Sequence, residues 1–475
     1  MQLQQLLAGV AVFDENPTIT SLVCDSRKVT EGCLFVCIDG VAIDAHRFAA
    51  EALNTGAAAV VVQRDLGLPH QILVEDTRLA WALLSANWFG HPADRLHIIG
   101  ITGTNGKTST TYLLKQMLEA CGHKVGLCGT IQNLIGDRVV PSASTTPDAY
   151  ALQRLFAEMA DECCDYVVME VSSHALHQRR VAGVCFAAGV FTNLTQDHLD
   201  YHKTMENYCD AKRLLFLQSE CAVVQQNDPW VDRLTAGLTC PIYRFGIGDS
   251  ADYYASDIQY RPDGVDFTVN AGDRSQRVSL AMPGEFSVNN AMGAVTAALA
   301  VGLPFDKVCG AISALTGVNG RAEIIPTDSD FTVVVDYAHT PDGLEKICQT
   351  LQLGLRGRLI TLFGCTGDRD RTKRPIMGAI AARLSDLLVL TSDNPGSEDP
   401  MDIIDEVLPG IPEGTPMVIL PDRAEAVRWA IENARPGDTV LLAGKGHETY
   451  QILKDRTVDL DERKIVAEVL AGKKD

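Results

Sequence analysis

The chain has 475 residues, of which 46% are hydrophobic, and its formal net charge is −20. At roughly 100–200 residues per domain this length predicts several domains, and the acidity argues against nucleic-acid binding, which needs clustered Lys and Arg. The 14 cysteines include no C-x-x-C pair, so a zinc framework is not expected. The first residues have no basic segment of a signal peptide, and many cysteines without one favour a reducing cytoplasm.

Residues 1–90 combine three short β-like runs, LFVCI, AAVVV and HQILV, with the helical stretch EDTRLAWALLSANWFG. This pattern predicts a small α/β domain. Gly90, His91 and Pro92 then interrupt the helix and mark a candidate boundary of this domain.

A glycine-rich loop follows. HIIGIT is apolar and β-like, Gly100 to Thr108 reads GITGTNGKT, and TTYLLKQMLEACG predicts a helix that closes at Gly122. In such an arrangement backbone N–H groups and the helix N-terminus cradle a polyphosphate, Lys107 reaches the distal phosphates and Thr108 offers a hydroxyl to Mg²⁺. The spacing departs from a strict Walker A motif, because five residues rather than four separate Gly100 from Gly106. By itself the loop predicts only that a polyphosphate binds.

Two further residues in the next hundred positions are candidates for metal chemistry. Glu170 ends the apolar strand YVVME, where an open parallel sheet meets its ligand, and a carboxylate there can hold Mg²⁺. His198, in TNLTQDHLDYH after another apolar strand, is a second candidate ligand. The alternatives are a solvated loop carboxylate for Glu170 and a hydrogen-bonded histidine for His198. Lys212, in NYCDAKRLLF, is predicted to be a solvated lysine on a helix.

The strands in this region alternate with helices, which predicts a mostly parallel sheet, whereas YRPDGVDFTVNAG to SLAMPG alternates like antiparallel strands. Residues 286–305 carry no charge, so length alone admits a membrane span. Asn289, Asn290 and Pro304 favour a buried amphipathic helix instead. Beyond about residue 325 the α/β pattern restarts, which predicts a separate domain.

Three polar clusters follow strands of that last domain. They are DYAHTP (336–341), the locally basic GCTGDRDRTKR (364–374) and GKGHE (444–448). Because the carboxyl ends of parallel strands share one edge, these clusters are expected at a common ligand site.

Together these motifs resemble the Mur ligases of bacterial cell-wall synthesis. The resemblance runs in order from about residue 21 to the C-terminus, through GITGTNGKT, STTPD, MEVSSHAL, FTNLTQDHLDYH, GRAE, DYAHTPD, GCTGDRDRTKRP, SDNP and AGKGHETYQ. It is strongest to members that add the third residue to UDP-N-acetylmuramoyl-L-alanyl-D-glutamate. Folylpolyglutamate synthases share the loop, but they do not resemble EVSSHAL or GKGHE.

The resemblance implies an α/β fold of three domains. Residues 1–90 would bind the uridine nucleotide, residues 91–324 would form a central P-loop ATPase domain with a parallel sheet, and residues 325–475 a Rossmann-like domain for the incoming amino acid. It also implies ATP and Mg²⁺ as cofactors and an acyl-phosphate mechanism.

Residue roles carry over where the motifs match. ATP would contact Gly103, Thr104, Asn105, Gly106, Lys107, Thr108, Ser109, Asn290 and Arg321. Thr108, Glu170, His198 and Lys212 would serve metal ions and catalysis, with Lys107 on the phosphates and Lys212 carbamylated to an anion. The muramoyl-dipeptide nucleotide would lie against Cys24, Ser26, Val41, Ala42, Ile43, Ser144, Thr145, Thr146, Ser172, Gln178 and Arg180. The amino acid would contact Arg369, Asp393, Asn394, Pro395, Gly396, Gly444 and Glu448.

Gly396 is the one departure that bears on the substrate. Members that add meso-diaminopimelate resemble D-N-P-R here, and that arginine clamps the distal carboxylate in a bidentate pair. A glycine supplies no such charge, as in lysine-adding members, whereas GKGHE and the flanking TSDNP-x-SEDP are of the diaminopimelate type. The sequence favours meso-diaminopimelate, with L-lysine or another diamino acid as the alternative.

Two other classes of function stay open at this stage. A P-loop kinase or NTPase switch would need no muramoyl acceptor, and a non-catalytic scaffold would not need the intact Lys107, Glu170, His198 and Lys212. A cytoplasmic monomer without membrane insertion is expected.

Overall fold

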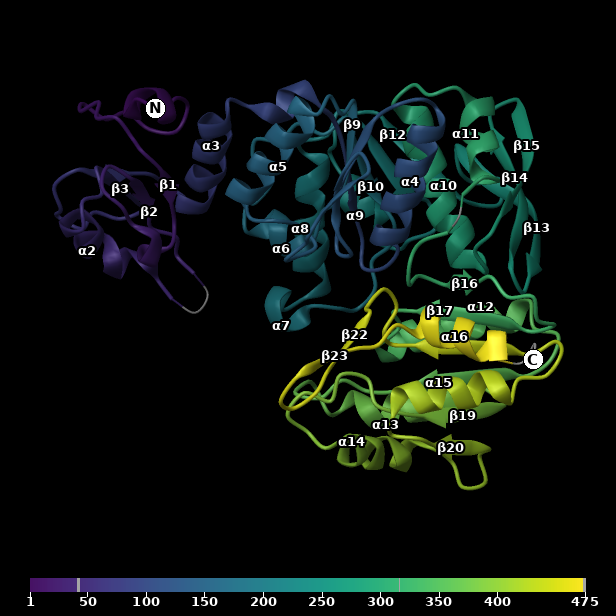
Figure 1. The fold of residues 1–475 in the computed structure, drawn as a ribbon. Coiled ribbons are helices and arrows are strands. Elements are labelled where there is room, and N and C mark those ends of the chain that lie inside the picture. The colour runs from purple at the N-terminus through teal and green to yellow at the C-terminus, as the bar shows by residue number, and fades with distance from the viewer. Residues whose placement is uncertain (41–42, 316, 473–475) are drawn as a thin grey trace. The chain divides into compact units, whose positions relative to one another are not determined.

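The computed structural model describes residues 1–40, 43–315 and 317–472 (Figure 1). The chain divides into two compact units, one made of residues 1–246 and 293–308 and the other of residues 247–292 and 309–475. Both units are mixed α/β structures built on parallel sheets, which confirms the predicted fold class.

The N-terminal part of the first unit is a four-stranded parallel sheet. Its strands β1 (Leu22–Val23), β2 (Leu34–Val36), β3 (Ala59–Val62) and β4 (Gln71–Leu73) lie in sequence order. Helix α3 (Thr77–Phe89) begins at Asp76, whose side chain caps the N–H groups of Arg78 and Leu79, and ends at Gly90 in the left-handed conformation (φ 72°). The helix end predicted at Gly90 is therefore confirmed.

The larger sheet of the first unit has the order β12-β11-β10-β5-β9-β6-β7-β8. Strands β5 (His97–Thr102), β6 (Val125–Cys128), β9 (Tyr166–Glu170), β10 (Ala188–Phe191), β11 (Ala222–Gln225) and β12 (Ile242–Ile247) run parallel, and β7 (Asn133–Ile135) and β8 (Arg138–Val140) close one edge antiparallel. The crossover helices are α4 (Lys107–Ala120), α5 (Ala149–Asp161), α6 (Ser173–His177), α7 (Leu199–His202), α8 (Met205–Phe216) and α9 (Val231–Thr235).

The strand order indicates where this sheet binds a ligand. After β5 the chain crosses to β6, returns to β9 beside β5, and then continues to β10 on the other side of β5. The carboxyl ends of β9, β5 and β10 are consequently adjacent, since Ile101 lies opposite Glu170 and Thr102 opposite Phe191. Such a reversal of strand order opens the crevice in which α/β sheets bind ligands.

The second unit contains a meander and a doubly covered sheet. Strands β13 (Tyr253–Arg261), β14 (Gly264–Ala271) and β15 (Arg274–Leu280) pair antiparallel, as their alternation predicted. The other sheet has the order β16-β17-β21-β18-β19-β20, formed by Glu323–Ile325, Thr332–Asp336, Thr439–Ala443, Leu359–Phe363, Leu387–Leu390 and Met417–Ile419. Only β16 in this sheet pairs antiparallel.

Helices cover both faces of the β16–β21 sheet (Figure 1). Helices α12 (Pro341–Leu353), α13 (Lys373–Leu384) and α14 (Pro400–Val407) share one apolar core with the sheet, and α15 (Arg423–Glu432) and α16 (Glu462–Gly472) share another. Because each buried strand faces a core on both sides, its residues are apolar almost without alternation, as in LITLF.

The uncharged stretch predicted as an amphipathic helix forms α10 (Glu285–Ala300), followed by α11 (Phe305–Ile312). Residues 290–298 are all buried, so this helix is enclosed on every side rather than on one face. Among the described residues, none of the helices has the length and apolar character needed to span a bilayer.

Candidate functional site

The phosphate-binding loop lies between β5 and α4 and is held by the segment after β10. Gly103 has φ 151°, and a Cβ built on it would lie 1.9 Å from Thr192 Oγ1, so only glycine fits. The N–H of Thr104 donates to the carbonyl of Asn193 (2.8 Å), and Thr192 Oγ1 donates to the carbonyl of Asn105 (2.6 Å). Gly106 caps α4 with φ 84°, and Ser109 follows in the first turn. The loop is thereby shaped before any ligand arrives.

Two lysines converge on the carbonyl oxygen of Gly103. Lys107 Nζ donates to Gly103 O (2.9 Å) and Thr104 O (2.8 Å), and Lys212 Nζ donates to Gly103 O (2.8 Å). Lys212 is 1% exposed, so its reading as a solvated helix lysine is wrong. Burial, with the nearby charge of Lys107, lowers its pKa well below the ordinary value. The Lys212 ammonium lies 4.5 Å from the ring centre of Tyr208, one turn earlier on α8.

Glu170 is buried at the end of β9 and receives three hydrogen bonds. Its Oε2 accepts from Thr108 Oγ1 (2.9 Å) and Thr130 Oγ1 (3.0 Å), and its Oε1 accepts from the N–H of Thr130 (2.8 Å). The solvated-carboxylate alternative is therefore wrong, because Glu170 is only 1% exposed. Thr130 was not among the predicted site residues, although it too is a polar residue just after an apolar strand.

The predicted dipeptide residues of the central region come together. Thr146 Oγ1 donates to the carbonyl of Glu170 (2.8 Å) and accepts from the N–H of Ser172 (3.0 Å). Arg180 donates to the carbonyl of Thr146 (2.9 Å) and, through two nitrogens, to Oε1 of Gln178 (3.1 and 2.8 Å). Two further hydrogen bonds place Ser144 and Thr145 in the same cluster: Ser144 Oγ to Thr146 O, and Thr130 Oγ1 to Thr145 Oγ1.

His198 stands at the start of α7, half-exposed, with φ 53°. Its ring packs edge-on against His174 with 4.8 Å between centroids. Tyr201, one turn later, was not predicted: its hydroxyl contacts Nδ1 of His177 (2.9 Å) and accepts from Nε2 of Gln178 (3.3 Å). No group of three or more His, Cys, Asp or Glu side chains set for a metal occurs in the part of the chain that the structure describes.

Of the predicted uridine residues, Ser26 begins the short 3-10 helix Ser26–Lys28, with Asp25 as its cap. Cys24 is half-buried, and burial raises the pKa of its thiol to about 11. Ile43 is 52% exposed. Val41 and Ala42 lie outside the described residues.

In the second unit residues that follow β17, β18, β19 and β21 line one cavity of about 690 Å³. The three polar clusters after β17, β18 and β21 therefore share one sheet edge, as predicted. Its lining includes Tyr337, His339, Arg369, Lys373, Asp393, Asn394, Gly396, Gly444 and Glu448. Gly444 has φ 112°, and a Cβ there would lie 2.7 Å from Asp393 Oδ2. Pro395 packs on Gly367, where a Cβ would lie 1.9 Å from the Pro395 carbonyl oxygen.

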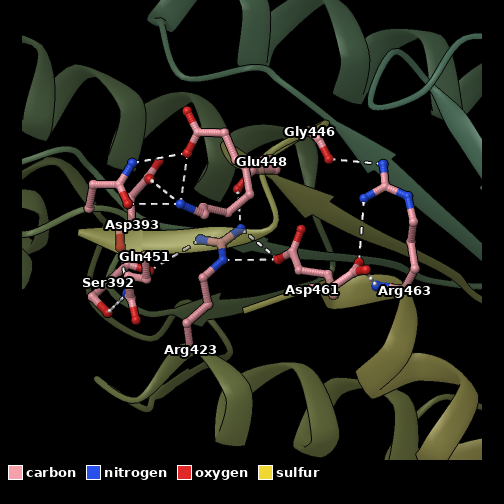
Figure 2. A network of polar contacts seen from close by, with 12 residues as sticks. Ser392, Asp393, Arg423, Gly446, Glu448, Gln451, Asp461 and Arg463 are labelled. Atoms are coloured by element: carbon pink, nitrogen blue, oxygen red, sulfur yellow. Dashed lines mark hydrogen bonds and ion pairs between the residues drawn. The ribbon is translucent and has the colours of Figure 1, made fainter. Parts of the chain in front are cut away.

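A buried polar network, part of which Figure 2 shows, includes the cavity-lining residues Asp393, Asn394 and Glu448. Lys445, fully buried, donates to Asn394 Oδ1 (2.8 Å) and Glu448 Oε2 (2.8 Å), and Asn394 Nδ2 donates to the same Glu448 oxygen (3.0 Å). Beneath them Arg423, also buried, donates to Glu462 Oε1 (2.9 Å) and to the carbonyl oxygen of Ala443 (2.8 Å). The bonds of Lys445 fix Glu448 and Asn394 in place. Neither Lys445 nor Arg423 was predicted as a site residue.

The basic cluster GCTGDRDRTKR is divided by its contacts. Arg374 is fully buried and pairs with Glu398 (2.8 Å) and Glu406 (2.8 Å), and Arg371 pairs with Glu398 (3.2 Å). These bonds, Arg374 foremost, lower the pKa of Glu398 to about 2. Two of the four predicted cations are therefore structural, and the other two line the cavity.

Gly396 sits in a turn that is closed by Asp368. It has φ 59°, and a Cβ there would lie 2.2 Å from Asp368 Oδ2. That carboxylate accepts from the N–H of Ser397 (2.9 Å) and from its hydroxyl (2.5 Å).

The two residues predicted for ATP in this part of the chain differ in setting. Asn290 is buried in α10. Arg321 lies with its guanidinium 4.8 Å from the ring centre of Tyr337, and its Nε is buried without a hydrogen-bond partner among the described residues.

Comparison with known proteins identifies the family of this chain. Three families match successive parts of the chain: "Mur ligase family, catalytic domain" over residues 18–77, "Mur ligase middle domain" over 101–298 and "Mur ligase, glutamate ligase domain" over 320–446. A solved structure of UDP-N-acetylmuramoyl-L-alanyl-D-glutamate–2,6-diaminopimelate ligase is 31% identical, with a TM-score of 0.76 over 100% of this chain and 99% of that one. Folylpolyglutamate synthase from Mycobacterium tuberculosis, at 20% identity and TM-score 0.62, shares the fold over 78% of this chain and 91% of its own.

Curated relatives extend over nearly the whole length. The UDP-N-acetylmuramoyl-L-alanyl-D-glutamate–2,6-diaminopimelate ligase of Clostridium botulinum is 44% identical, covering 97% of this chain and 96% of its own. That of Caldanaerobacter subterraneus is 46% identical, covering 99% of both chains.

The fold, the loop and the comparisons together define an ATP-dependent ligase, an enzyme that uses the hydrolysis of a nucleoside triphosphate to form a new bond. The chain belongs to the Mur ligase family, as its motifs predicted.

Proposed function

We propose that this ligase joins a diamino acid, meso-diaminopimelate, to the D-glutamyl carboxyl group of UDP-N-acetylmuramoyl-L-alanyl-D-glutamate, and so acts in peptidoglycan precursor synthesis. The relatives named for this reaction support the substrates. One observation in this chain carries the chemistry: hydrogen bonds run from Thr108 of the phosphate loop through Glu170 and Thr130 to Thr145. The loop and the proposed acceptor segment therefore meet at one sheet edge.

Mg²⁺ fits this edge. Thr108 Oγ1 and Glu170 Oε2 are hard oxygen donors, adjacent and beside the loop, which is the chemistry Mg²⁺ prefers. Thr108, Glu170, His198 and a modified Lys212 would hold the metal ions. Bound Mg²⁺ would neutralise charge on the ATP phosphates.

The reaction proposed for this site is the acyl-phosphate mechanism that the family resemblance implies. The acceptor's glutamyl carboxylate oxygen attacks the γ-phosphorus of ATP, ADP leaves, and an acyl phosphate forms. The neutral amine of the amino acid then attacks the acyl carbon, giving a tetrahedral intermediate that expels phosphate and loses a proton as the amide forms. Backbone N–H groups of residues 103–109 and Lys107 would hold the phosphates, so that catalysis is chiefly positioning and charge stabilisation.

Lys212 is proposed to be carbamylated. Its buried amine has a lowered pKa, and the neutral amine is the form that adds to CO₂, giving a carbamate and releasing one proton. An anion at this position would also relieve the repulsion between Lys212 and Lys107.

Substrate residues are assigned by region, with the domains as 1–90, 91–324 and 325–475. Cys24, Ser26 and residues 41–43 would contact the uridine nucleotide, and Ser144, Thr145, Thr146, Ser172, Gln178 and Arg180 the muramoyl-dipeptide. Gly103–Ser109, Asn290 and Arg321 would contact ATP. The amino acid would bind in the 690 Å³ cavity, beside Arg369, Asp393–Gly396, Gly444 and Glu448.

Phosphate release tests the proposal. Purified protein with ATP, Mg²⁺ and UDP-N-acetylmuramoyl-L-alanyl-D-glutamate should release phosphate only when an amino acid is supplied, with meso-diaminopimelate preferred over L-lysine and L-ornithine. Release that needs neither acceptor nor amino acid would instead indicate an NTPase switch. We also propose that the protein is cytoplasmic, because ATP and nucleotide-activated precursors are available in the cytoplasm. It is proposed to be a monomer, which sedimentation at working concentration tests.

A further inference from the structure

The charges of the amino-acid cavity distinguish between diamino acids. Resting on the proposed function, we propose that Lys373 binds the distal carboxylate of the incoming amino acid and is the residue that selects diaminopimelate over lysine. Position 396, where an arginine was expected for this role, contributes no side chain.

Ion pairs separate the basic cluster into two groups. Arg371 and Arg374 are each tied to Glu398 and Glu406. Arg369 and Lys373 line the cavity, and within the described ranges neither makes an ion pair. Lys373 is half-buried and fixed by one bond, from Nζ to the carbonyl oxygen of His339 (3.0 Å). A partly desolvated ammonium that donates only to a neutral oxygen favours an anionic ligand.

The acidic side of the cavity is partly neutralised. Lys445 lies 2.8 Å from Glu448 and 4.0 Å from Asp393, so these three groups sum to a charge of −1. Lys445 and Asn394 both bond Oε2 of Glu448, while Oε1 has no bond from the described residues. This side therefore matches one ammonium group.

The two cavity cations that make no ion pair among the described residues match a ligand with two carboxylates. With its reacting amine neutral, diaminopimelate carries one ammonium and two carboxylates, which correspond to the −1 cluster and to Arg369 and Lys373. L-Lysine has a single carboxylate and would leave one of these cations without a ligand carboxylate to bind. Asp368 also lines the cavity and carries a negative charge, but hydrogen bonds from the N–H and the hydroxyl of Ser397 engage both of its oxygens, so this carboxylate is held by the 396–397 turn.

Position 396 is unsuited to supply the cation itself. Gly396 has a left-handed φ of 59°, which other residues rarely adopt, and Asp368 fills the space a side chain would enter. Lys373 comes from the start of α13, on a different segment from 393–396. The cation proposed to bind the distal carboxylate therefore comes from the start of α13 and not from position 396.

The test compares kcat and KM for meso-diaminopimelate and L-lysine in the wild type, Lys373→Met and Lys373→Arg, at saturating ATP and acceptor. Loss of a charged contact predicts that KM for diaminopimelate rises about 10- to 100-fold in Lys373→Met, with KM for lysine nearly unchanged. Lys373→Arg keeps the charge and should retain the diaminopimelate preference. Lys346→Met removes an exposed lysine that pairs with Asp342 on α12 and is the matched control.

Five outcomes decide between these readings. A selective loss of diaminopimelate use in Lys373→Met, with KM for ATP and acceptor unchanged, supports the inference. An equal loss for both amino acids, or a Lys373→Arg protein as impaired as Lys373→Met, overturns it, because Lys373 would then hold a group both substrates share or be structural. A wild type that prefers lysine also overturns it, while leaving the ligase reaction intact. A wild type that uses neither amino acid refutes the proposed function itself.

Discussion

Thr108 Oγ1 donates a 2.9 Å hydrogen bond to Glu170 Oε2, which joins the first turn of α4 to the end of β9. Sixty-two positions separate these residues in the chain. Their contact depends on β5 and β9 being neighbours in the sheet, with Ile101 opposite Glu170. It places a buried carboxylate next to the loop that receives phosphates.

Glu170→Gln tests the carboxylate. The substitution preserves shape but removes the charge, so we expect the Mg²⁺ concentration for half-maximal activity to rise about 10- to 100-fold. Titration of Mg²⁺ at fixed ATP measures it, and the unfolding temperature should change little. An unaltered Mg²⁺ requirement would remove Glu170 from the proposed metal site.

Lys212→Ala tests the carbamate. Loss of the amine should abolish activity, and bicarbonate or acetate should restore part of it by occupying the vacated space with an anion. In the wild type, ¹³C-bicarbonate should give a carbamate carbon signal that is missing from Lys212→Ala. Lys346→Ala is the control, and full activity in Lys212→Ala would show that the modification is not required.

Gly103→Ala separates collision from backbone strain. A Cβ at Gly103 would lie 1.9 Å from Thr192 Oγ1, whereas Gly248, also with positive φ (83°), has open space around it. We expect Gly248→Ala to cost about 1 kcal/mol of unfolding free energy, and Gly103→Ala to cost more and to raise KM for ATP. Denaturant unfolding and ATP kinetics measure the two effects. Equal costs without a change in KM would contradict the close packing of the loop.

Tyr201→Phe tests the support of the dipeptide residues. The Tyr201 hydroxyl accepts from Gln178 Nε2, and Gln178 in turn orients Arg180. Loss of one such hydrogen bond, about 0.5–1.5 kcal/mol, should raise KM for the muramoyl acceptor several-fold and leave KM for ATP unchanged. Tyr254→Phe in β13 is the control. A rise in both KM values would indicate a general structural effect.

Glu398→Gln tests the ion pair with buried Arg374. The pKa of Glu398 is about 2 in the folded protein against an ordinary 4.5. Because a lowered folded-state pKa stabilises the protein above the ordinary value, this contribution is complete above about pH 5 and is lost as the pH falls toward 2. The variant should therefore unfold at lower denaturant than the wild type at pH 7, and the difference should shrink below pH 4.5. Glu413→Gln, an exposed loop position, should show no difference at either pH.

Local patterns in the sequence were enough to predict the strands, the helix ends and the phosphate-binding loop. Gly90 and Gly122 follow the ends of helices as expected, because their backbone requirements are local. The apolar runs predicted two parallel sheets, since a strand buried on both faces leaves a continuous hydrophobic signature. Motif order predicted the family.

Tertiary structure decided what each charged side chain does. Lys212 reads as a solvated lysine in its own segment, and a solvated carboxylate is the alternative for Glu170, yet both side chains are buried. Lys212 donates to Gly103, 109 positions away, and Glu170 accepts from Thr108, 62 positions away. In GCTGDRDRTKR, four cations look alike in sequence, yet Glu398 and Glu406 on later segments neutralise Arg371 and Arg374 and leave Arg369 and Lys373 to the cavity. Whether a charged side chain is buried or ion-paired depends on segments that come together only in the folded chain, so no local sequence pattern predicts it.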